Sequence, residues 1–384
     1  MGETVAVLDY GGRWMKAGWA FNFPTDEEPR VVTPSAVHVN QNAAAGAGEQ
    51  GELHRPIRGG KIVSWDQFEA LSYYVLYDLL GWELGNEGNI MLCEPLLTSR
   101  PDRETMAQLM FEVFNVTGLF VQDQAVLSLY AVGRTNGLVV DVGHDKIDVG
   151  TVTEGVLNTT SVRRLPYGGK HLTQHLQRML LQQDAAAAGG GSAQRPPLSE
   201  EAAEALKDLC ARCAESEAEF ASAIAADSSA AAPPPETFRL PDGQEFTISA
   251  ADRLRLGEAL FSPSALLLHP ASANPAEAAC DSAACLTDPL MRKLMYENLL
   301  LVGGGSVLPG ASSRFLSEMK SMLAPNANAT LCAVPEYMPT PSVPRDASWM
   351  GGAVLAKVAM IQGHFIVKAD YDEAGPVSVH RRCG

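Results

Sequence analysis

Two short motifs in this chain of 384 residues place an aspartate and then a glycine after an apolar run. They are Val5-Ala-Val-Leu-Asp9-Tyr-Gly11 and Leu138-Val-Val-Asp141-Val-Gly143. A tight turn after a buried strand directs backbone N–H groups toward phosphate oxygens, and the aspartate can hold a Mg²⁺ ion through water. Taken singly, each motif is better interpreted as an ordinary hairpin turn. The pair leaves a nucleotide site and two plain hairpins as equal alternatives, and the repetition indicates two related lobes.

A third, glycine-rich motif favours the nucleotide interpretation. The apolar run at residues 299–302 leads directly into Gly303, Gly304 and Gly305. Backbone with so few side chains lets an adenine or ribose lie against it. The motif is not a Walker loop, because no Gly-Lys-Ser/Thr follows it.

These motifs need buried strands to position them, and apolar runs of strand length are present. We expect strands at residues 4–8, 89–93, 138–142, 147–152 and 299–302. Apolar residues have helical spacing at 68–79, 106–114 and 172–180. Asp102, after Pro101, is the expected N-cap of the second of these helices. Alternating strands and helices indicate an α/β fold.

Composition limits the classes of function that the chain can serve. A formal net charge of −16 argues against direct, tight binding to nucleic acid. No apolar stretch reaches the roughly 18 residues that cross a bilayer, and residues 1–8 lack the layout of a signal peptide, so we expect neither membrane insertion nor export. The seven cysteines are scattered. Cys210 and Cys213 are interpreted as two thiols of one helix and not as a zinc or redox pair.

Three segments have low-complexity composition. Residues 39–52 are polar and rich in alanine and glycine, and residues 184–197 and 222–235 contain few large apolar side chains. Such segments cannot bury enough apolar surface to offset their ordering entropy. We therefore expect mobile surface insertions there.

Several further motifs resemble the actin family. They lie at residues 61–66, 110–115, 124–135, 349–352 and 370–383, and the similarity covers most of residues 1–37, 56–182 and 295–384. The resemblance implies an actin-like (ribonuclease H-like, duplicated) two-lobed α/β fold with a central nucleotide cleft. Its expected parts are a large subdomain of lobe one (1–37, 57–131 and 347–384), a truncated small subdomain (38–56), a large subdomain of lobe two (132–167 and 271–346), and a small subdomain of lobe two (168–270) that carries the insertions 184–197 and 222–235.

The resemblance also implies ATP or ADP with Mg as the cofactor. The cofactor-binding residues would be Asp9, Gly11, Gly12, Lys16, Asp141, Gly143, Gly303, Gly304 and Gly305. Asp9 and Asp141 would hold the metal through water. Gln124 matches the family's glutamine that positions the attacking water and is the candidate catalytic residue.

Departures from the family pattern predict slow or absent ATP hydrolysis, so we do not expect an enzyme. Arg13 stands where actin has a glycine, and the second turn carries His144, Asp145 and Lys146. A buried, unpaired Asp145 would oppose phosphate by several kcal/mol. The side chains around Lys207 do not match those that contact the nucleoside in actin.

Self-assembly into filaments is not expected either. In actin, two loops grip neighbouring subunits, and a head-to-tail polymer needs each repeat of its interface. Here one loop is shortened to residues 39–55 and the other is replaced by the Pro/Ala-rich residues 270–288.

The residues that match actin's partner-binding groove are retained. One wall would be formed by Tyr130, Gly133 and Thr135, and the other by Val354, Leu355 and Val358. An apolar groove of this kind accepts an amphipathic helix; alternatively, these residues only pack the junction of the lobes. Family members with this combination are typically nuclear and bind a helix of a chromatin-remodelling ATPase beside a second actin-related protein or actin.

Residues 81–90, 141–148 and 335–339 resemble one plant-type nuclear branch, in which His144 is a lineage trait. This branch implies a nuclear, chromatin-mediated role in gene expression and development, with the cytoplasm as a second location. The main alternative is a nucleotide-cycling, actin-like ATPase of the cytoplasm or cytoskeleton. A sugar or acetate kinase is a remote third, because we find neither a general base nor a sugar pocket.

Overall fold

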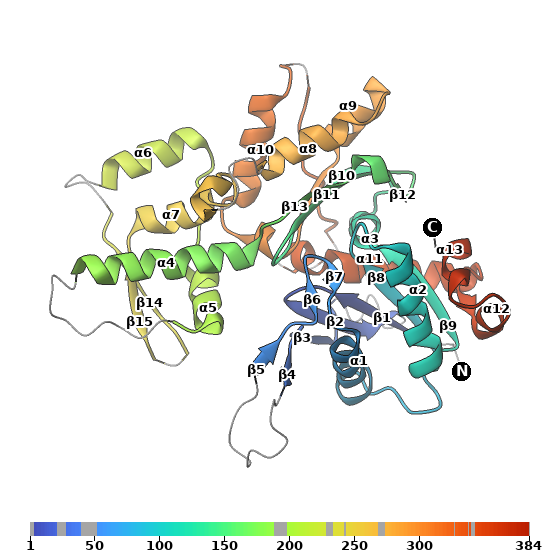
Figure 1. The fold of residues 1–384 in the computed structure, drawn as a ribbon. Coiled ribbons are helices and arrows are strands. Elements are labelled where there is room, and N and C mark those ends of the chain that lie inside the picture. Colours follow the sequence, from blue (N-terminus) through green and yellow to red (C-terminus); the bar gives the residue numbers. More distant parts are fainter. Residues whose placement is uncertain are drawn as a thin grey trace, which may run out of the picture. The chain divides into compact units, whose positions relative to one another are not determined.

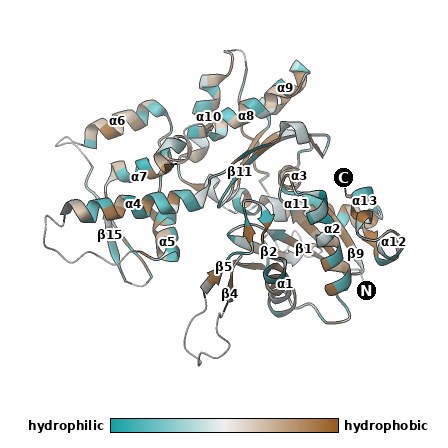
Figure 2. Cartoon of the chain, viewed as in Figure 1, coloured by the Kyte–Doolittle hydropathy of each residue, from teal (hydrophilic) through white to brown (hydrophobic). Residues whose placement is uncertain are grey.

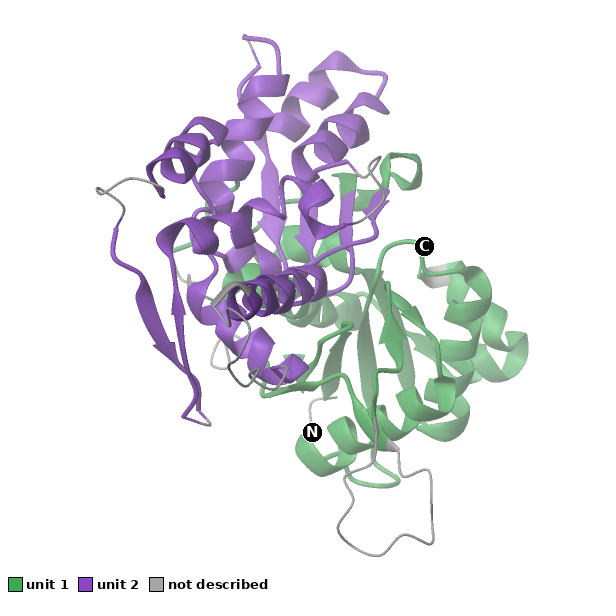
Figure 3. Cartoon of the chain, turned by 60° about the vertical axis from the view of Figure 1, so that its left-hand side comes forward, with its two compact units in different colours: residues 1–139, 150–162, 332–384 green, residues 140–149, 163–331 purple. Residues whose placement is uncertain are grey.

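The chain forms two compact units in a computed structural model, drawn in different colours in Figure 3. Unit 1 comprises residues 1–139, 150–162 and 332–384, and unit 2 comprises residues 140–149 and 163–331. Each unit is described by itself. The structure describes residues 4–20, 28–39, 52–187, 198–227, 233–241, 243–267, 273–325, 327–336, 338 and 342–383.

A mixed six-stranded sheet forms the centre of unit 1 (Figure 1). Its strand order is β17 (Ile366–Val367), β9 (Gly118–Asp123), β8 (Asn89–Glu94), β1 (Val5–Tyr10), β2 (Trp14–Trp19), β3 (Val31–Pro34). β1, β8 and β9 are parallel, whereas β2 pairs antiparallel with β1. Every residue of β1 and β8 is buried, as expected for parallel strands covered on both faces, and β9 is among the hydrophobic strands in Figure 2.

Helices and short hairpins complete unit 1. They are β4 (Val37–Val39), β5 (Glu52–His54), β6 (Ile57–Arg58), β7 (Lys61–Ile62), α1 (Trp65–Tyr73), α2 (Arg100–Gln108), α3 (Gln124–Ala131), β12 (Val156–Leu157), η4 (Thr159–Ser161), α11 (Val343–Ile361), α12 (Lys368–Ala374), η7 (Pro376–Ser378) and α13 (Val379–Arg382). Two π-helical turns, η2 (Tyr74–Leu79) and η3 (Leu109–Val113), continue α1 and α2. The N-cap predicted at Asp102 is wrong: Ser99 caps α2, because its hydroxyl accepts from the Asp102 amide and donates to the Asp102 carboxylate.

Helices α3 and α11 of unit 1 cross in close contact. A Cβ added at Gly351 would lie 1.7 Å from the carbonyl oxygen of Leu127, and one at Gly352 would lie 2.9 Å from Cys93 Sγ. Glycine at these two positions therefore lets the helix backbones approach each other. Next to them Trp349 is fully buried, and its indole donates to the carbonyl of Val7 in β1 at 3.3 Å.

A second sheet has the strand order β12, β11 (Ile147–Thr153), β10 (Gly137–Val142), β16 (Leu299–Val302), with β13 (Arg163–Leu165) paired to β11. The chain passes between the units within β10 and β11. The other elements of unit 2 are α4 (Gly169–Ala187), α5 (Glu200–Cys210), α6 (Glu217–Asp227), β14 (Glu236–Arg239), β15 (Glu245–Ile248), α7 (Ala250–Glu258), η5 (Pro263–Leu266), α8 (Pro275–Ala284), α9 (Pro289–Glu297), η6 (Gly304–Val307) and α10 (Ala311–Met322). All five strand predictions and all three helix predictions thus fall on observed elements.

The low-complexity segments are more regular than expected where the structure describes them. Helix α4 extends to residue 187 and α6 extends to residue 227. Residues 40–51, 188–197 and 228–232 lie outside the described residues. The Pro/Ala-rich segment contains α8, whose capping box joins Asn274 and Glu277 and whose small side chains Ala276, Ala279 and Ala283 are fully buried.

The cysteine pair does not lie on one helix, contrary to the sequence-based interpretation. Helix α5 ends at Cys210, and Cys213 follows outside any helix or strand, where its amide donates to the carbonyl of Pro309 at 2.8 Å. Both are free, buried thiols, and burial raises the pKa of each to about 12. Among the described residues, no helix combines the length and apolarity that crossing a membrane requires.

Candidate functional site

The two Asp-x-Gly turns have the same local geometry, one in each unit. The Gly11 amide donates to the carbonyl of Trp14 at 3.0 Å, and the Gly143 amide donates to the carbonyl of Lys146 at 3.0 Å. A Cβ would lie 3.1 Å from the Trp14 oxygen at Gly11 and 2.9 Å from the Lys146 oxygen at Gly143. Both turns therefore close on an i to i+3 bond that favours glycine, as the repeated motif predicts.

Asp9 lies at the centre of a polar network in unit 1. Gln124 Nε2 donates to Asp9 Oδ1 at 2.7 Å, and the Ser348 hydroxyl donates to Asp9 Oδ2 at 2.5 Å. Only 4% of Asp9 is exposed. The structure thus brings Gln124 to the predicted metal-holding aspartate and leaves the Gln124 amide oxygen available to a further donor.

Lys16 belongs to the same network and neutralises protein carboxylates. Its ammonium lies 3.2 Å from Asp346 Oδ1 and 3.6 Å from Asp9 Oδ2, and it donates to the carbonyl of Arg345 at 2.6 Å. The side chain of Asp346 is completely buried and also accepts from Arg345. Asp346 and Ser348 were not found from the sequence, although they immediately precede the Trp349 motif, which carries the family resemblance.

In unit 2, the third glycine run packs against the end of β10. A Cβ at Gly303, whose φ is +91°, would lie 2.3 Å from Asp141 Oδ1, and a Cβ at Gly305 would lie 2.4 Å from Val142 Cγ1. At Gly304, no heavy atom of the described residues other than its own neighbours in the chain lies within 4 Å of the position of an added Cβ. The structure therefore joins the second and third motifs and gives Gly304 a backbone with open space beside it, which fits a flat ligand group.

The charged residues that depart from the actin pattern have protein partners. Lys146 pairs with Asp148, which also accepts from Arg164 Nε at 2.6 Å. Burial alone would raise the pKa of Asp148, but Lys146 and Arg164 together hold it below its ordinary value. Lys207 pairs with Asp208 at 3.0 Å, and the guanidinium of Arg13 lies 5.2 Å from the ring centre of Trp14.

The predicted partner residues all lie in unit 1, on or next to α3 and α11. We call Tyr130, Gly133, Thr135, Val354, Leu355 and Val358 the partner surface. Gly133, Thr135 and Val358 are exposed, and the other three are partly buried. Ile361, which is 86% exposed, was missed, although it continues the i, i+4, i+7 spacing of Val354 and Val358.

Comparison with known proteins gives matches over nearly the whole chain. The family model described as Actin matches residues 2–384. The chain is 38% identical over 383 residues to actin-related protein 7 of Arabidopsis thaliana, covering 98% of this chain and 99% of that protein. The proteins of that name from Oryza sativa subsp. indica and subsp. japonica are 38% identical over 379 residues, again covering 98% and 99%. The predicted resemblance and the predicted actin-like α/β fold are confirmed.

Proposed function

Because the chain belongs to the actin family, we propose that it is a non-polymerising structural subunit of a chromatin-remodelling complex. Its partner would be a helix of the remodelling ATPase, bound beside a second actin-related protein or actin. The protein would act in the nucleus, in the regulation of gene expression and development. Binding would stabilise one conformation of the motor's helix without any chemical step.

The observation that carries this proposal is the exposed apolar end of α11. Val358 is 43% exposed and Ile361 is 86% exposed, one helical turn apart. Neighbouring α3 ends at Ala131 and is followed by Gly133, which has a φ of +69°, and by the exposed Thr135. An apolar helix face flanked by small residues accepts another amphipathic helix. Exposure of these side chains favours a role in binding a partner over the alternative, in which they only pack the junction of the lobes.

Nucleotide binding is a second part of the proposal. In unit 1, the Gly11–Gly12 turn would contact phosphate, and Asp9 with Gln124 would order the hydration shell of Mg²⁺. In unit 2, Asp141 and Gly143 would have the same roles, and the bare backbone at Gly304 would lie against the nucleoside. ATP or ADP bound in this way would stabilise the folded chain by mass action.

We propose that hydrolysis is slow or absent. Lys16 already neutralises Asp9 and the buried Asp346, and Lys146 already neutralises Asp148. Neither ammonium group is therefore available to neutralise the negative charge that develops on a phosphate during hydrolysis. The contact between Gln124 and Asp9 favours the alternative, a nucleotide-cycling ATPase, because it places a water-orienting amide at the first turn. Steady phosphate release at the rate of actin, by the purified chain, would establish that alternative.

Affinity purification of the tagged full chain from nuclear extract tests the main proposal. Mass spectrometry should recover a remodelling ATPase and a second actin-like protein in stoichiometric amounts. A synthetic peptide of the captured ATPase's helix should then bind the purified chain. Thr135→Arg should weaken peptide binding at least about tenfold, since it places a charge within an apolar contact.

Val377→Arg is a matched control, because Val377 is 47% exposed on η7, outside the partner surface. It should bind the peptide like the unmodified chain. Equal binding by Thr135→Arg and the unmodified chain would move the partner site elsewhere. Recovery of cytoskeletal proteins alone would overturn the chromatin role.

A further inference from the structure

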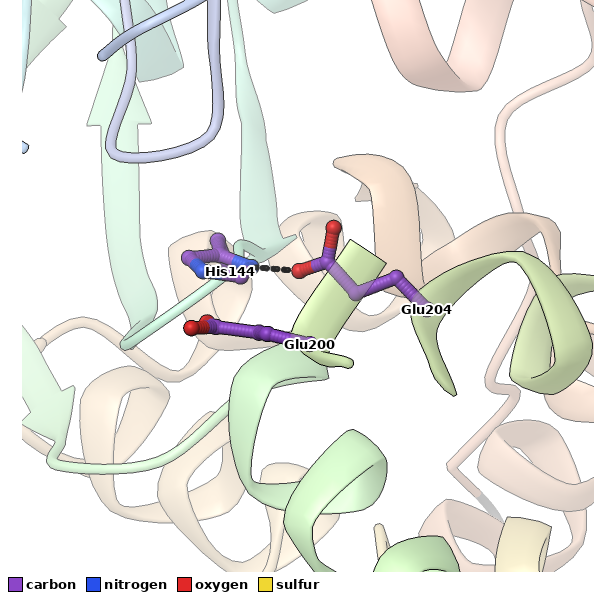
Figure 4. Close-up of side chains that lie close together, drawn as sticks. All are labelled: His144, Glu200 and Glu204. Atoms are coloured by element: carbon purple, nitrogen blue, oxygen red, sulfur yellow. Dashed lines mark ion pairs between the residues drawn. The ribbon is translucent and has the colours of Figure 1, made fainter. Parts of the chain in front are cut away.

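Three side chains of unit 2 converge beside the second Asp-x-Gly turn (Figure 4). They are His144, which directly follows Gly143, and Glu200 and Glu204 of α5. Their ligand atoms all lie within 4.8 Å of one another, and His144 Nδ1 lies 3.6 Å from Glu204 Oε1. The side chains of His144 and Glu204 are only 4% and 6% exposed, whereas Glu200 is exposed.

The backbone around His144 is fixed before any ligand binds. The Lys170 amide donates to the carbonyl of His144 at 2.6 Å, and the Gly169 amide donates to the carbonyl of Gly143 at 3.0 Å. A Cβ at Gly168 would lie 2.4 Å from the Gly143 oxygen. The start of α4 thus holds the turn in place, which is the preorganisation that a ligand site needs.

The two glutamates are positioned by the start of α5. Ser199 caps this helix by accepting from the Ala202 amide. Residues four apart lie on one face of a helix, so the carboxylates of Glu200 and Glu204 project on the same side. Two like charges with this spacing repel each other, and burial makes the charge of Glu204 more costly. A divalent cation between them would offset both effects.

We propose that His144, Glu200 and Glu204 form a binding site for a divalent transition metal, with Zn²⁺ as the best fit. Imidazole nitrogen and carboxylate oxygen are both zinc ligands, with bonds of about 2.0–2.2 Å. Tetrahedral geometry at such bond lengths separates ligand atoms by roughly 3.3 Å. The 3.6 Å between His144 and Glu204 is near this value, and the exposed Glu200 side chain is free to close the remaining distance.

The ligand set also argues against other cations. Mg²⁺ and Ca²⁺ prefer oxygen ligands alone, so a buried imidazole selects against them. Three protein ligands leave a fourth position for water or for an oxygen of a second ligand. The Lys207 ammonium on the same helix is paired with Asp208. A bound metal would fasten the second Asp-x-Gly turn to α5, whatever partner the whole chain binds.

Titration of the metal-stripped full chain with Zn²⁺ tests this site. We expect one equivalent to bind and to raise the thermal unfolding midpoint, with Mg²⁺ at a hundredfold excess unable to compete. His144→Ala and Glu204→Gln should each lower the zinc affinity at least about tenfold, since even outer-shell changes cost about 10- to 100-fold. Glu201→Gln, an exposed carboxylate of the same helical turn, should bind like the unmodified chain.

Cysteine thiolates are the competing ligands, so the titration uses a Cys285→Ser background and includes Co²⁺. Cys285 is the exposed thiol among the described residues. Visible absorption typical of tetrahedral Co²⁺, without a sulfur charge-transfer band, would support the His/Glu/Glu site. A sulfur band, or equal zinc affinity in the His144→Ala variant and the unmodified chain, would overturn it. So would the absence of zinc binding by the correctly folded, unmodified chain.

Discussion

At the scale of single residues, a substitution of Lys16 distinguishes a structural role of this side chain from a role in binding nucleotide. Lys16→Met leaves the carboxylates of Asp346 and Asp9 without their shared ammonium, although Arg345 still contacts Asp346. Breaking a buried ion pair leaves an uncompensated charge, so we expect a loss of about 3 kcal/mol in the free energy of unfolding without nucleotide. Chemical denaturation measures this loss. Lys293→Met, at a 62% exposed side chain, is the control and should change stability little.

Unchanged stability of Lys16→Met, together with a loss of nucleotide affinity, would contradict this structural role. It would support instead the role predicted from the sequence, in which Lys16 neutralises phosphate.

Asp123 predicts a pH dependence of stability. Burial, followed by the nearby Glu94 carboxylate, raises the pKa of Asp123 to about 7, although Arg103 opposes this rise. The folded-state pKa lies above the unfolded value, so the folded chain takes up a proton that the unfolded chain has released. Stability therefore falls as pH rises from about 4 to 7. Asp123→Asn should remove this dependence and gain on the order of 1–3 kcal/mol relative to the unmodified chain between pH 5 and pH 8.

Denaturation at several pH values measures the difference between the Asp123→Asn variant and the unmodified chain. Asp372→Asn is the control, because its side chain is 61% exposed and should give a nearly constant difference. If the difference in the free energy of unfolding between Asp123→Asn and the unmodified chain is also constant with pH, the Asp123 carboxyl has an ordinary pKa in the folded chain.

The part of the candidate site that is made of residues close together in the sequence could be predicted. The contacts between residues far apart in the sequence could not. Asp9 and Asp141 are found because strand, aspartate and glycine are consecutive. The hydroxyl of Ser348 reaches Asp9 from the other end of the chain, and Glu204 reaches His144 from a helix beyond an insertion. Such pairs depend on tertiary packing, which no local periodicity encodes.

At the scale of elements, strands were predictable and helix ends were not. The strands predicted at β1, β8 and β10 are mostly apolar runs that are buried along nearly their whole length. The π-helical turns η2 and η3 follow α1 and α2 without any break in the apolar pattern. Helix α8 was missed because its buried side chains are alanines, which a search for large periodic residues does not detect.

The crossing of α3 and α11 gives a prediction at this scale. Gly351→Ala would place a Cβ 1.7 Å from the Leu127 carbonyl oxygen, so the helices must separate. Overpacking costs about 1–3 kcal/mol and more where backbone blocks relaxation, and we expect about 3 kcal/mol by chemical denaturation. Partner binding should weaken too, because both helices carry the partner surface. Lys357→Ala, on the same helix, is the control; equal stability of the two variants would show that the crossing tolerates a wider separation.

At the scale of the whole molecule, we expect the purified chain to remain monomeric under conditions that polymerise actin. The Pro/Ala-rich segment, which we predict to replace one filament loop, contains α8, which packs against α10 and β13 within unit 2 and buries its alanines. Those side chains are therefore unavailable for a contact with a neighbouring subunit. A formal charge of −16 adds repulsion between copies, and salt screens it over about 8–10 Å.

Sedimentation tests this expectation, with actin as the positive control. The samples contain Mg²⁺, ATP and salt at roughly 50 to 200 mM, concentrations at which repulsion between surface charges is increasingly screened. The chain should stay in the supernatant at every salt concentration, because a head-to-tail filament fails when one repeating contact is missing. Pelleting only at high salt would show that charge, and not the lost loops, prevents assembly. Pelleting throughout would overturn the scaffold role, since subunits in a filament would have a complete self-interface in place of the surface proposed for a remodelling ATPase.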